Sequence, residues 1–182
     1  MASDKQIAEF VGIMLGDGCI SCYHNKFRSR IKVHRCVKVT LDSRNNEYTL
    51  HVSNLMRDIL LVNPLIRYRK GENTVDVKTH TLKALDYVTK DLGLKLSPKW
   101  DTMKIPSLYE KGTLGLKVIK GLFDTDGCIT VFNNNGTIYP RIEIKICPSP
   151  AQNQIISILS DNGFNFKIQK LDREKIRIRL SG

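Results

Sequence analysis

The chain has 182 residues, of which 41% are hydrophobic, so it can bury a core as one domain or as two small fused domains. Its formal net charge of +11, from 29 Lys and Arg against 18 Asp and Glu, is unusual for a metabolic enzyme and favours a polyanionic partner. No apolar stretch approaches the roughly 20 residues of a membrane span, and no signal-peptide pattern opens the chain, so we expect an intracellular, non-secreted protein with no membrane partner.

The first predicted element is a helix over residues 5–17, where apolar residues recur at helical spacing and Gly18 is available as a left-handed stop. Its end carries a short motif at residues 12–20, which closes an apolar run with Asp-Gly. The motif recurs at residues 121–129, at the end of a second predicted helix over 113–126. The two copies lie too far apart for a solenoid and indicate two related half-domains, each bringing one carboxylate to a shared place.

The elements after each motif follow one order: strand, strand, helix, strand, strand. In the first half we predict strands over 19–33 and 36–42, a helix over 46–61, strands over 64–70 and 73–79, and a further helix over 80–92. In the second half we predict strands over 128–133 and 139–147, a helix over 150–162, and strands over 164–171 and 174–180. We therefore expect an α+β fold with two duplicated halves, residues 1–92 and 113–182. The stretch 93–112, which holds the single Trp100, is interpreted as an ordered connector.

Each predicted motif helix carries small residues four positions apart on one face. They are Gly12 and Gly16 in the first helix, and Gly121 and Thr125 in the second. Small residues at this spacing let two helix backbones approach closely. If the helices pack about a pseudo-twofold axis, Asp17 and Asp126 meet at the adjoining C-terminal ends.

Two carboxylates at helix C-termini are unfavourable, because the helix dipole disfavours anions there and the two charges repel each other. A divalent cation removes both penalties. Carboxylate oxygens, together with the backbone carbonyls of Gly16 and Thr125, suit Mg²⁺, and Mn²⁺ or Ca²⁺ could take the same site. One Asp-Gly alone would indicate a helix stop, but two copies in matched contexts favour a metal site. Asp124, whose first-half counterpart is Leu15, is interpreted either as structural or as a residue that supports the neighbouring metal ligand without binding the metal itself.

At these motifs the chain resembles a LAGLIDADG homing endonuclease, because residues 10–18 and 119–127 occupy the two signature positions. The resemblance covers nearly the whole chain through the repeated order of elements. It implies a monomer that mimics a homodimer, with the motif helices at the seam and two antiparallel sheets forming a saddle for double-stranded DNA. It also implies that Asp17 and Asp126 bind catalytic metal, and that both strands of a long asymmetric site are cut across the minor groove with short 3′ overhangs.

Members of this family commonly place a Lys or Gln on a strand near the scissile phosphate, and Lys145 fits that place in the second half. The first-half counterpart would be Thr40, with Lys38 close by. Lys145 is therefore expected to be catalytic, stabilising developing charge or organising water. One strand is expected to be cut more slowly than the other.

Cationic side chains alternate along four predicted strands, so in each strand they project from one face. A β-ribbon fits the DNA major groove, where Arg and Lys donate to guanine while neighbouring phosphates fix the register. A solvated strand face is the alternative explanation for a single run. The expected DNA-binding residues are Lys26, Arg28, Arg30, Lys32, Lys38, Arg67, Arg69, Arg141, Lys145, Lys175, Arg177 and Arg179.

Three other features carry no functional assignment. The five cysteines lack a second pair at zinc spacing and are expected to be buried free thiols. The four histidines show no metal spacing. Residues Asn133 to Gly136 have the composition of a hairpin turn, which explains their polar side chains.

We therefore expect a site-specific, Mg²⁺-dependent DNA endonuclease of the intron-homing type. One alternative is a maturase of the same fold, which binds its host intron RNA and assists splicing. A second is a DNA-binding regulator that has lost catalysis. The paired acids argue against both, because a protein that only binds nucleic acid does not need them. A bifunctional endonuclease and maturase remains open at this point.

Overall fold

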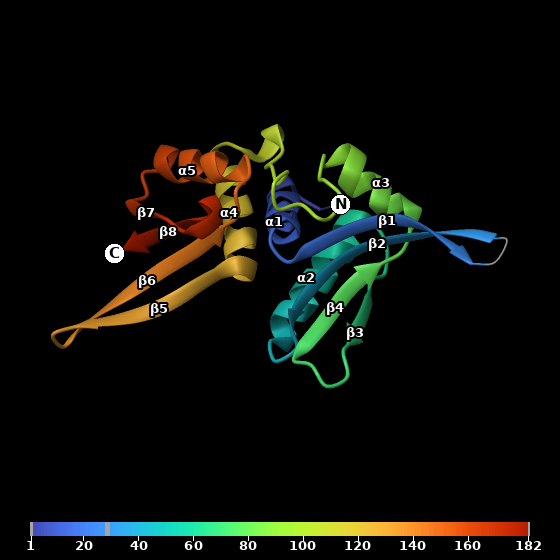
Figure 1. The fold of residues 1–182 in the computed structure, drawn as a ribbon, viewed down its shortest axis with the longest axis horizontal. Helices are drawn as coiled ribbons and strands as arrows, with labels where there is room; N and C mark the ends of the chain where they lie inside the picture. Colours follow the sequence, from blue (N-terminus) through green and yellow to red (C-terminus); the bar gives the residue numbers. More distant parts are fainter. Residues whose placement is uncertain (1, 28–29, 182) are drawn as a thin grey trace.

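The computed structural model describes residues 2–27 and 30–181, which form two halves with the same order of elements (Figure 1). The first half contains α1 (Asp4–Leu15), β1 (Gly18–Phe27), β2 (Arg30–Asp42), α2 (Asn46–Leu60), β3 (Leu65–Tyr68) and β4 (Thr74–Thr79). The second contains α4 (Gly112–Asp126), β5 (Gly127–Asn134), β6 (Thr137–Ile146), α5 (Ala151–Asp161), β7 (Phe166–Lys170) and β8 (Ile176–Ser181). The predicted α+β duplication is confirmed.

Each half has one four-stranded antiparallel sheet. The strand orders are β1-β2-β4-β3 and β5-β6-β8-β7, so the two sheets share one topology. Figure 1 shows α1 and α4 side by side between the sheets, with the β1–β2 and β5–β6 hairpins pointing away in opposite directions. The motif helices therefore lie at the seam between the halves.

The extra helix predicted for the first half is present. It consists of α3 (Leu82–Asp86), followed directly by one π-helical turn over Tyr87–Asp91. The connector then leads to α4 through a short 3-10 turn at Ser107–Tyr109. A last 3-10 turn, Asp172–Glu174, joins β7 to β8. Among the described residues, no helix has both the length and the apolar character needed to cross a bilayer.

Helix α1 begins with a capping box, in which the Gln6 amide donates to the Ser3 hydroxyl and the Ser3 amide donates to the Gln6 side chain. From Ala8 to Leu15 every residue of α1 is buried. One hydrophobic core spans both halves and includes Phe10 and Ile13 of α1 with Val118 and Leu122 of α4. Burial on nearly all sides identifies α1 as a central helix that packs against both its own sheet and α4.

The close approach of α1 and α4 depends on two glycines. A Cβ atom on Gly12 would overlap the carbonyl oxygen of Val118, and one on Gly121 would overlap the carbonyl oxygen of Glu9. The two contacts are related by the pseudo-symmetry of the halves. The predicted packing of the helices through small residues is thus confirmed.

The prediction that Gly18 ends the first motif helix in a left-handed conformation is wrong. The helix ends at Leu15, Gly16 caps it at φ −78° and ψ −104°, and Gly18 begins β1. Glycine is needed at position 18 for space, because a Cβ atom there would overlap the backbone of Met14. Gly127 likewise has an extended backbone, at φ −79° and ψ 159°.

The predicted boundary between the first two strands is also wrong. β1 ends at Phe27, which pairs with Arg30 at the start of β2, so the chain does not turn near residues 34–35 as predicted. The register pairs Lys26 with Ile31 and Asn25 with Lys32. Residues paired across antiparallel strands share a sheet face, so Lys26 lies on the opposite face from Lys32. Arg28 lies outside the described residues.

The expectation of buried cysteines is corrected. All five cysteines are free, but Cys22 and Cys128 are exposed and the other three are partly exposed. Cys128 pairs with Glu143 on the open face of the second sheet. Cys22 pairs with Arg35 on the projecting part of the first hairpin. Both thiols therefore lie on sheet surfaces that the helices leave uncovered.

Candidate active site

The two motif aspartates come together at the seam. Asp126 is the last residue of α4, and Asp17 follows α1 by two residues. A Cβ atom on Gly16 would lie 3.2 Å from Asp126 Oδ2 and would overlap the Thr125 hydroxyl. The Asp126 carboxylate thus reaches across the seam to the end of the first motif helix, as the repeated sequence predicts.

Burial makes this pair of acids hard to ionise. It raises the pKa of Asp17 to about 6, and the neighbouring charge of Asp126 adds to the shift. Burial also raises the pKa of Asp126. The positive charge of Lys99 acts in the opposite direction on both groups. A divalent cation bound between the two carboxylates would strongly stabilise their ionised forms.

Lys99, from the connector, holds the end of α1. Its ammonium donates to the carbonyl oxygens of Met14, Gly16 and Gly18, at 2.5, 2.7 and 2.7 Å. These carbonyls lie at the negative end of the helix dipole, where a cation is favoured. Burial nevertheless lowers the pKa of Lys99 to about 8, against the effect of Asp126 and Asp17. The Gly16 carbonyl, an expected metal ligand, already accepts one hydrogen bond from this lysine.

Thr125, the other residue expected to supply a carbonyl ligand, packs against Gly16 at the seam. Its hydroxyl donates to the carbonyl oxygens of Gly121 and Leu122, at 3.3 and 3.0 Å. The Thr125 side chain is therefore occupied within α4, and a role in metal binding rests on its backbone carbonyl alone.

Lys145 lies beside the acid of its own half. It lines a cavity of roughly 220 Å³ together with Gly16, Lys99, Trp100 and Asp126. Its pairing with Arg177 places it on the open face of the second sheet, because the paired neighbours Ile144 and Ile178 are buried on the other face. Lys145 can thus reach a group bound at Asp126.

Among the described residues of the first half, no lysine takes the place of Lys145 beside the acid. Thr40 is the counterpart of Lys145, and its hydroxyl donates to Asp76 Oδ1 at 2.9 Å. Lys38 lies 3.8 Å from the same carboxylate oxygen, and Arg69 donates to it at 2.9 Å. Although burial raises the pKa of Asp76, the hydrogen bonds from Arg69 and Thr40 outweigh it and hold the pKa below its usual value. The two halves of the site are chemically unequal.

The open face of the second sheet gathers the predicted cations around one carboxylate. Arg179 donates to Glu143 at 2.6 Å, and Arg177 and Arg141 lie 3.6 and 4.0 Å from Glu143 oxygens. Lys175 lies with Lys145 at the rim of a second cavity on this half. The carboxylate fixes the orientation of the arginines and leaves a basic surface.

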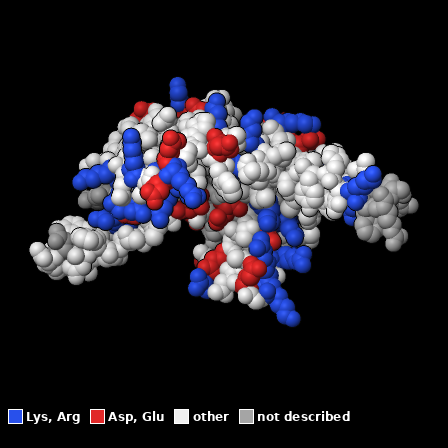
Figure 2. Space-filling model, viewed as in Figure 1, with Lys and Arg blue, Asp and Glu red and all other residues white. Residues whose placement is uncertain are grey.

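The first sheet has a similar arrangement around Asp76. The register places Arg67, Thr40 and Asp76 side by side on the open face. Lys38 lies two residues before Thr40 on the same face of β2. Lys32 belongs to the same face of β2 by alternation. Figure 2 shows Lys and Arg side chains over both halves, with acidic side chains among them. Of the predicted DNA-binding residues whose side chains are described, Lys26 is the one that lies on the other sheet face.

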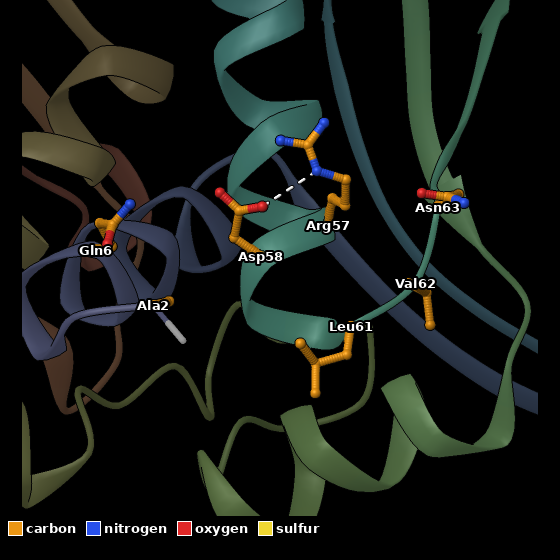
Figure 3. A pocket seen from close by; sticks show the side chains of 7 residues that line it. All are labelled: Ala2, Gln6, Arg57, Asp58, Leu61, Val62 and Asn63. Atoms are coloured by element: carbon orange, nitrogen blue, oxygen red, sulfur yellow. Dashed lines mark hydrogen bonds and ion pairs between the residues drawn. The ribbon is translucent and has the colours of Figure 1, made fainter.

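The cavity drawn in Figure 3 is not lined by Asp17 or Asp126. It has a volume of roughly 500 Å³ and is lined from the start of α1 and the end of α2. Arg57 and Asp58 form an ion pair at 3.1 Å inside it. None of the predicted site residues lines this cavity, so the chemistry is assigned to the other end of α1.

Comparison with known proteins decides the family. Residues 8–182 match the LAGLIDADG DNA endonuclease family. The chain belongs to this family. Comparison with curated protein sequences gives no match.

Solved structures of LAGLIDADG proteins share the fold at low sequence identity. Mesophilic variants of the homing endonuclease I-DmoI match with a TM-score of 0.66 at 19% identity, over 98% of this chain and 89% of theirs. I-DmoI in complex with DNA and Mn matches with a TM-score of 0.66 at 19% identity, over 98% and 90% of the two chains. I-GzeII in complex with its DNA target matches with a TM-score of 0.63 at 11% identity, over 96% and 78%. These matches show that the chain shares a fold with two pseudo-symmetric halves, and below we call α1 and α4, which carry the two sequence motifs, the LAGLIDADG helices.

One polar network at the LAGLIDADG seam is not apparent from the sequence motifs. Glu9, which is 7% exposed, accepts from Lys120 across the seam at 2.9 Å and lies 2.8 Å from His51 of α2. Lys120 also pairs with Asp124 at 2.6 Å. The spacing of Lys120 and Asp124 on one helix signals their pairing. Glu9 carries no such signal, because its partners come from two other helices.

The raised pKa of Asp17 gives the metal-free protein an unusual pH dependence. Since the folded state keeps the Asp17 proton up to about pH 6 and the unfolded chain loses it near the ordinary aspartate pKa of 3.8, stability falls as the pH rises between these values and stays low above them. In EDTA we expect a melting temperature a few degrees higher at about pH 5 than at about pH 8. Ca²⁺ should raise it at the higher pH. Asp17→Asn should flatten both responses, and an unchanged response in Asp17→Asn would show that Asp17 is not the titrating group.

Proposed function

We propose that this chain is a single-chain homing endonuclease that makes a double-strand break in a long, asymmetric DNA site. The observation that carries the proposal is the meeting of Asp17 and Asp126 at the seam, one acid from each half, between two basic sheet faces. One acid per half suits a duplex with two strands to cut. The family match favours this reading over the maturase and regulator alternatives.

The divalent ion proposed for this site is Mg²⁺. Asp17 and Asp126 would hold it, with the carbonyls of Gly16 and Thr125 nearby, and the two buried carboxylates with raised pKa values fit such a cation. When bound, a divalent ion lowers the pKa of a water and neutralises charge on the scissile phosphate. Neighbouring proteins of the fold were studied with Mn, Ca and Mg, which supports a divalent ion of this kind.

The chain's own groups would position the DNA and stabilise charge. Lys145, beside Asp126, would donate to the scissile phosphate of one strand and stabilise the charge that develops on it. The two basic faces would bind the backbone and bases on either side of the cut. The proposed contacts are Lys32, Lys38, Arg67, Arg69, Arg141, Lys145, Lys175, Arg177 and Arg179.

The proposal is tested by selecting a target and then cutting it. The chain is incubated in EDTA with random-sequence duplexes, bound duplexes are recovered over several rounds, and the selected duplex is then exposed to Mg²⁺, Mn²⁺ or Ca²⁺. We expect a double-strand break with Mg²⁺ and none in EDTA. A selected duplex that binds but is never cut with any of the three ions would refute the endonuclease assignment.

The unequal halves predict that the two strands are cut at different rates. Lys145 lines the cavity beside Asp126 and makes no ion pair within the described part of the chain, whereas the hydroxyl of its counterpart Thr40 donates to Asp76. A nicked intermediate should therefore accumulate before the linear product. Lys145→Met should slow the faster strand by about a hundredfold, the scale seen when one charge-stabilising donor is removed. The measurement uses a selected duplex with a different fluorophore on each strand, and equal slowing of both strands would contradict the prediction.

A further inference from the structure

Trp100 is a large aromatic side chain in an exposed position next to the acids. It is the only tryptophan of the chain, and its surface is 71% exposed. Tryptophan is seldom left this exposed, since its indole loses much by contact with water. A partner that covers it would explain its position.

The backbone on both sides of Trp100 is firmly held. Before it, Ser97 donates its amide to the Ile20 carbonyl at 2.8 Å, and Lys99 makes its three hydrogen bonds at the end of α1. After it, the Met103 carbonyl accepts from the Ala151 amide at 3.0 Å, and Ile105 is fully buried. The connector is thus anchored to the first half before Trp100 and to the second half after it. The indole projects from a fixed backbone.

The indole also lies at the cavity of the second-half acid. Trp100 lines the same 220 Å³ cavity as Asp126, Lys145 and Lys99. If the scissile phosphate binds between Asp126 and Lys145, its neighbouring nucleotide would lie at the cavity wall that contains the indole. Because the connector occurs once in the chain, only one of the two strands can meet it.

We propose that Trp100 packs its indole against the nucleotide next to the scissile phosphate on the Asp126 side. It is a positioning residue, because it holds the strand in line with groups that act on the phosphate. Tryptophan suits this task, since stacking on a base is tolerant of sequence and an apolar side chain in the minor groove can hold a deformed step. The inference rests on the proposed function, because it requires that DNA lie across the seam.

The emission of Trp100 reports this contact without background from other tryptophans. In EDTA, the chain is titrated with a selected duplex that carries a fluorescein label, and the label's anisotropy measures binding independently. We expect the Trp100 emission to change on binding and its quenching by acrylamide to fall severalfold. Binding with unchanged emission and quenching would overturn the inference alone, whereas no binding to any duplex would overturn the proposed function with it.

The cleavage rates of the two DNA strands, measured separately, distinguish this contact from a purely structural role, which would affect both strands alike. Trp100→Ala should slow, by about tenfold, the same strand that Lys145→Met slows, and leave the other strand within about twofold. Trp100→Phe should restore most of the rate because it keeps an aromatic face. Leu108→Ala is the matched control, because Leu108 is another exposed apolar residue of the connector, at 72%, and does not line the cavity. Equal slowing of both strands, or no slowing with native thermal stability, would refute the contact.

Discussion

Asp17→Asn and Asp126→Asn should each abolish double-strand cleavage, with a loss of at least about a thousandfold, while DNA binding is retained or tightened. Each substitution removes one of the two charges that would hold the divalent ion, and asparagine keeps the size of the side chain. Binding is spared because the cations of the two sheet faces are unchanged. The measurement is cleavage and affinity on the same selected duplex.

Asp124→Asn is the matched control for this prediction. Asp124 lies two positions before Asp126 on the same helix. Its carboxylate forms an ion pair with Lys120 at 2.6 Å, and we assign it no metal. It should keep cleavage within a few-fold of the wild type. Full cleavage by Asp17→Asn or Asp126→Asn, or an equal loss in Asp124→Asn, would remove the assignment of the paired acids.

Gly121→Ala should destabilise the protein by about 3 kcal/mol. The added methyl would overlap the carbonyl oxygen of Glu9, and backbone on both sides of the contact leaves no flexible side chain to move aside. The two LAGLIDADG helices would have to separate, which would also displace Asp126. Cleavage should therefore fall along with the free energy of unfolding, which is measured by urea titration.

Gly115→Ala on the same helix is the control, because it has the same effect on helix propensity as Gly121→Ala but lacks the overlap with the backbone of α1. Alanine favours a helix over glycine by about 1 kcal/mol at either position. At Gly115, however, an added Cβ would lie 3.2 Å from side-chain carbons of Ile158 and 3.3 Å from the Glu110 carbonyl carbon, so a shift of a few tenths of an ångström would relieve the contacts. We expect Gly115→Ala to be within about 1 kcal/mol of the wild type. If both variants were equally stable, the seam would not be packed as closely as the glycines indicate.

The two long hairpins show which local signals a sequence carries. The second hairpin turns at Asn135 and Gly136, which both have positive φ values, 50° and 87°, and this composition predicts the turn correctly. The first hairpin reverses direction between the paired residues Phe27 and Arg30, where the sequence has no glycine, proline or asparagine to mark a turn, so sequence patterns predict the turn several residues too late. On one continuous strand, Lys26 and Lys32 would share a sheet face, because side chains alternate with a period of two residues. With the turn before Arg30, Lys26 instead pairs with Ile31 and lies on the opposite face from Lys32.

The acid pair was predictable and its surroundings were not. Asp17 and Asp126 were found because repetition marks them twice in matched contexts. Lys99 comes from the connector, 83 positions from the Gly16 carbonyl that accepts its hydrogen bond, and no periodic pattern links the two. No sequence motif distinguishes Asp76 or Glu143 from other polar residues of the predicted strands. Only the register of the sheets shows that each lies among the predicted DNA-binding cations.

The most direct test of the paired site is to map both cut positions on a selected duplex. Because Asp17 and Asp126 lie together at the seam, the proposed site requires the two scissile phosphates to face each other across one groove, and we propose that it is the minor groove, across which facing cuts leave 3′ overhangs. Sequencing of the product ends should therefore show both strands cut within a few base pairs, with short 3′ overhangs. Blunt ends, 5′ overhangs or cuts scattered along the duplex would contradict a single shared site built from the two acids.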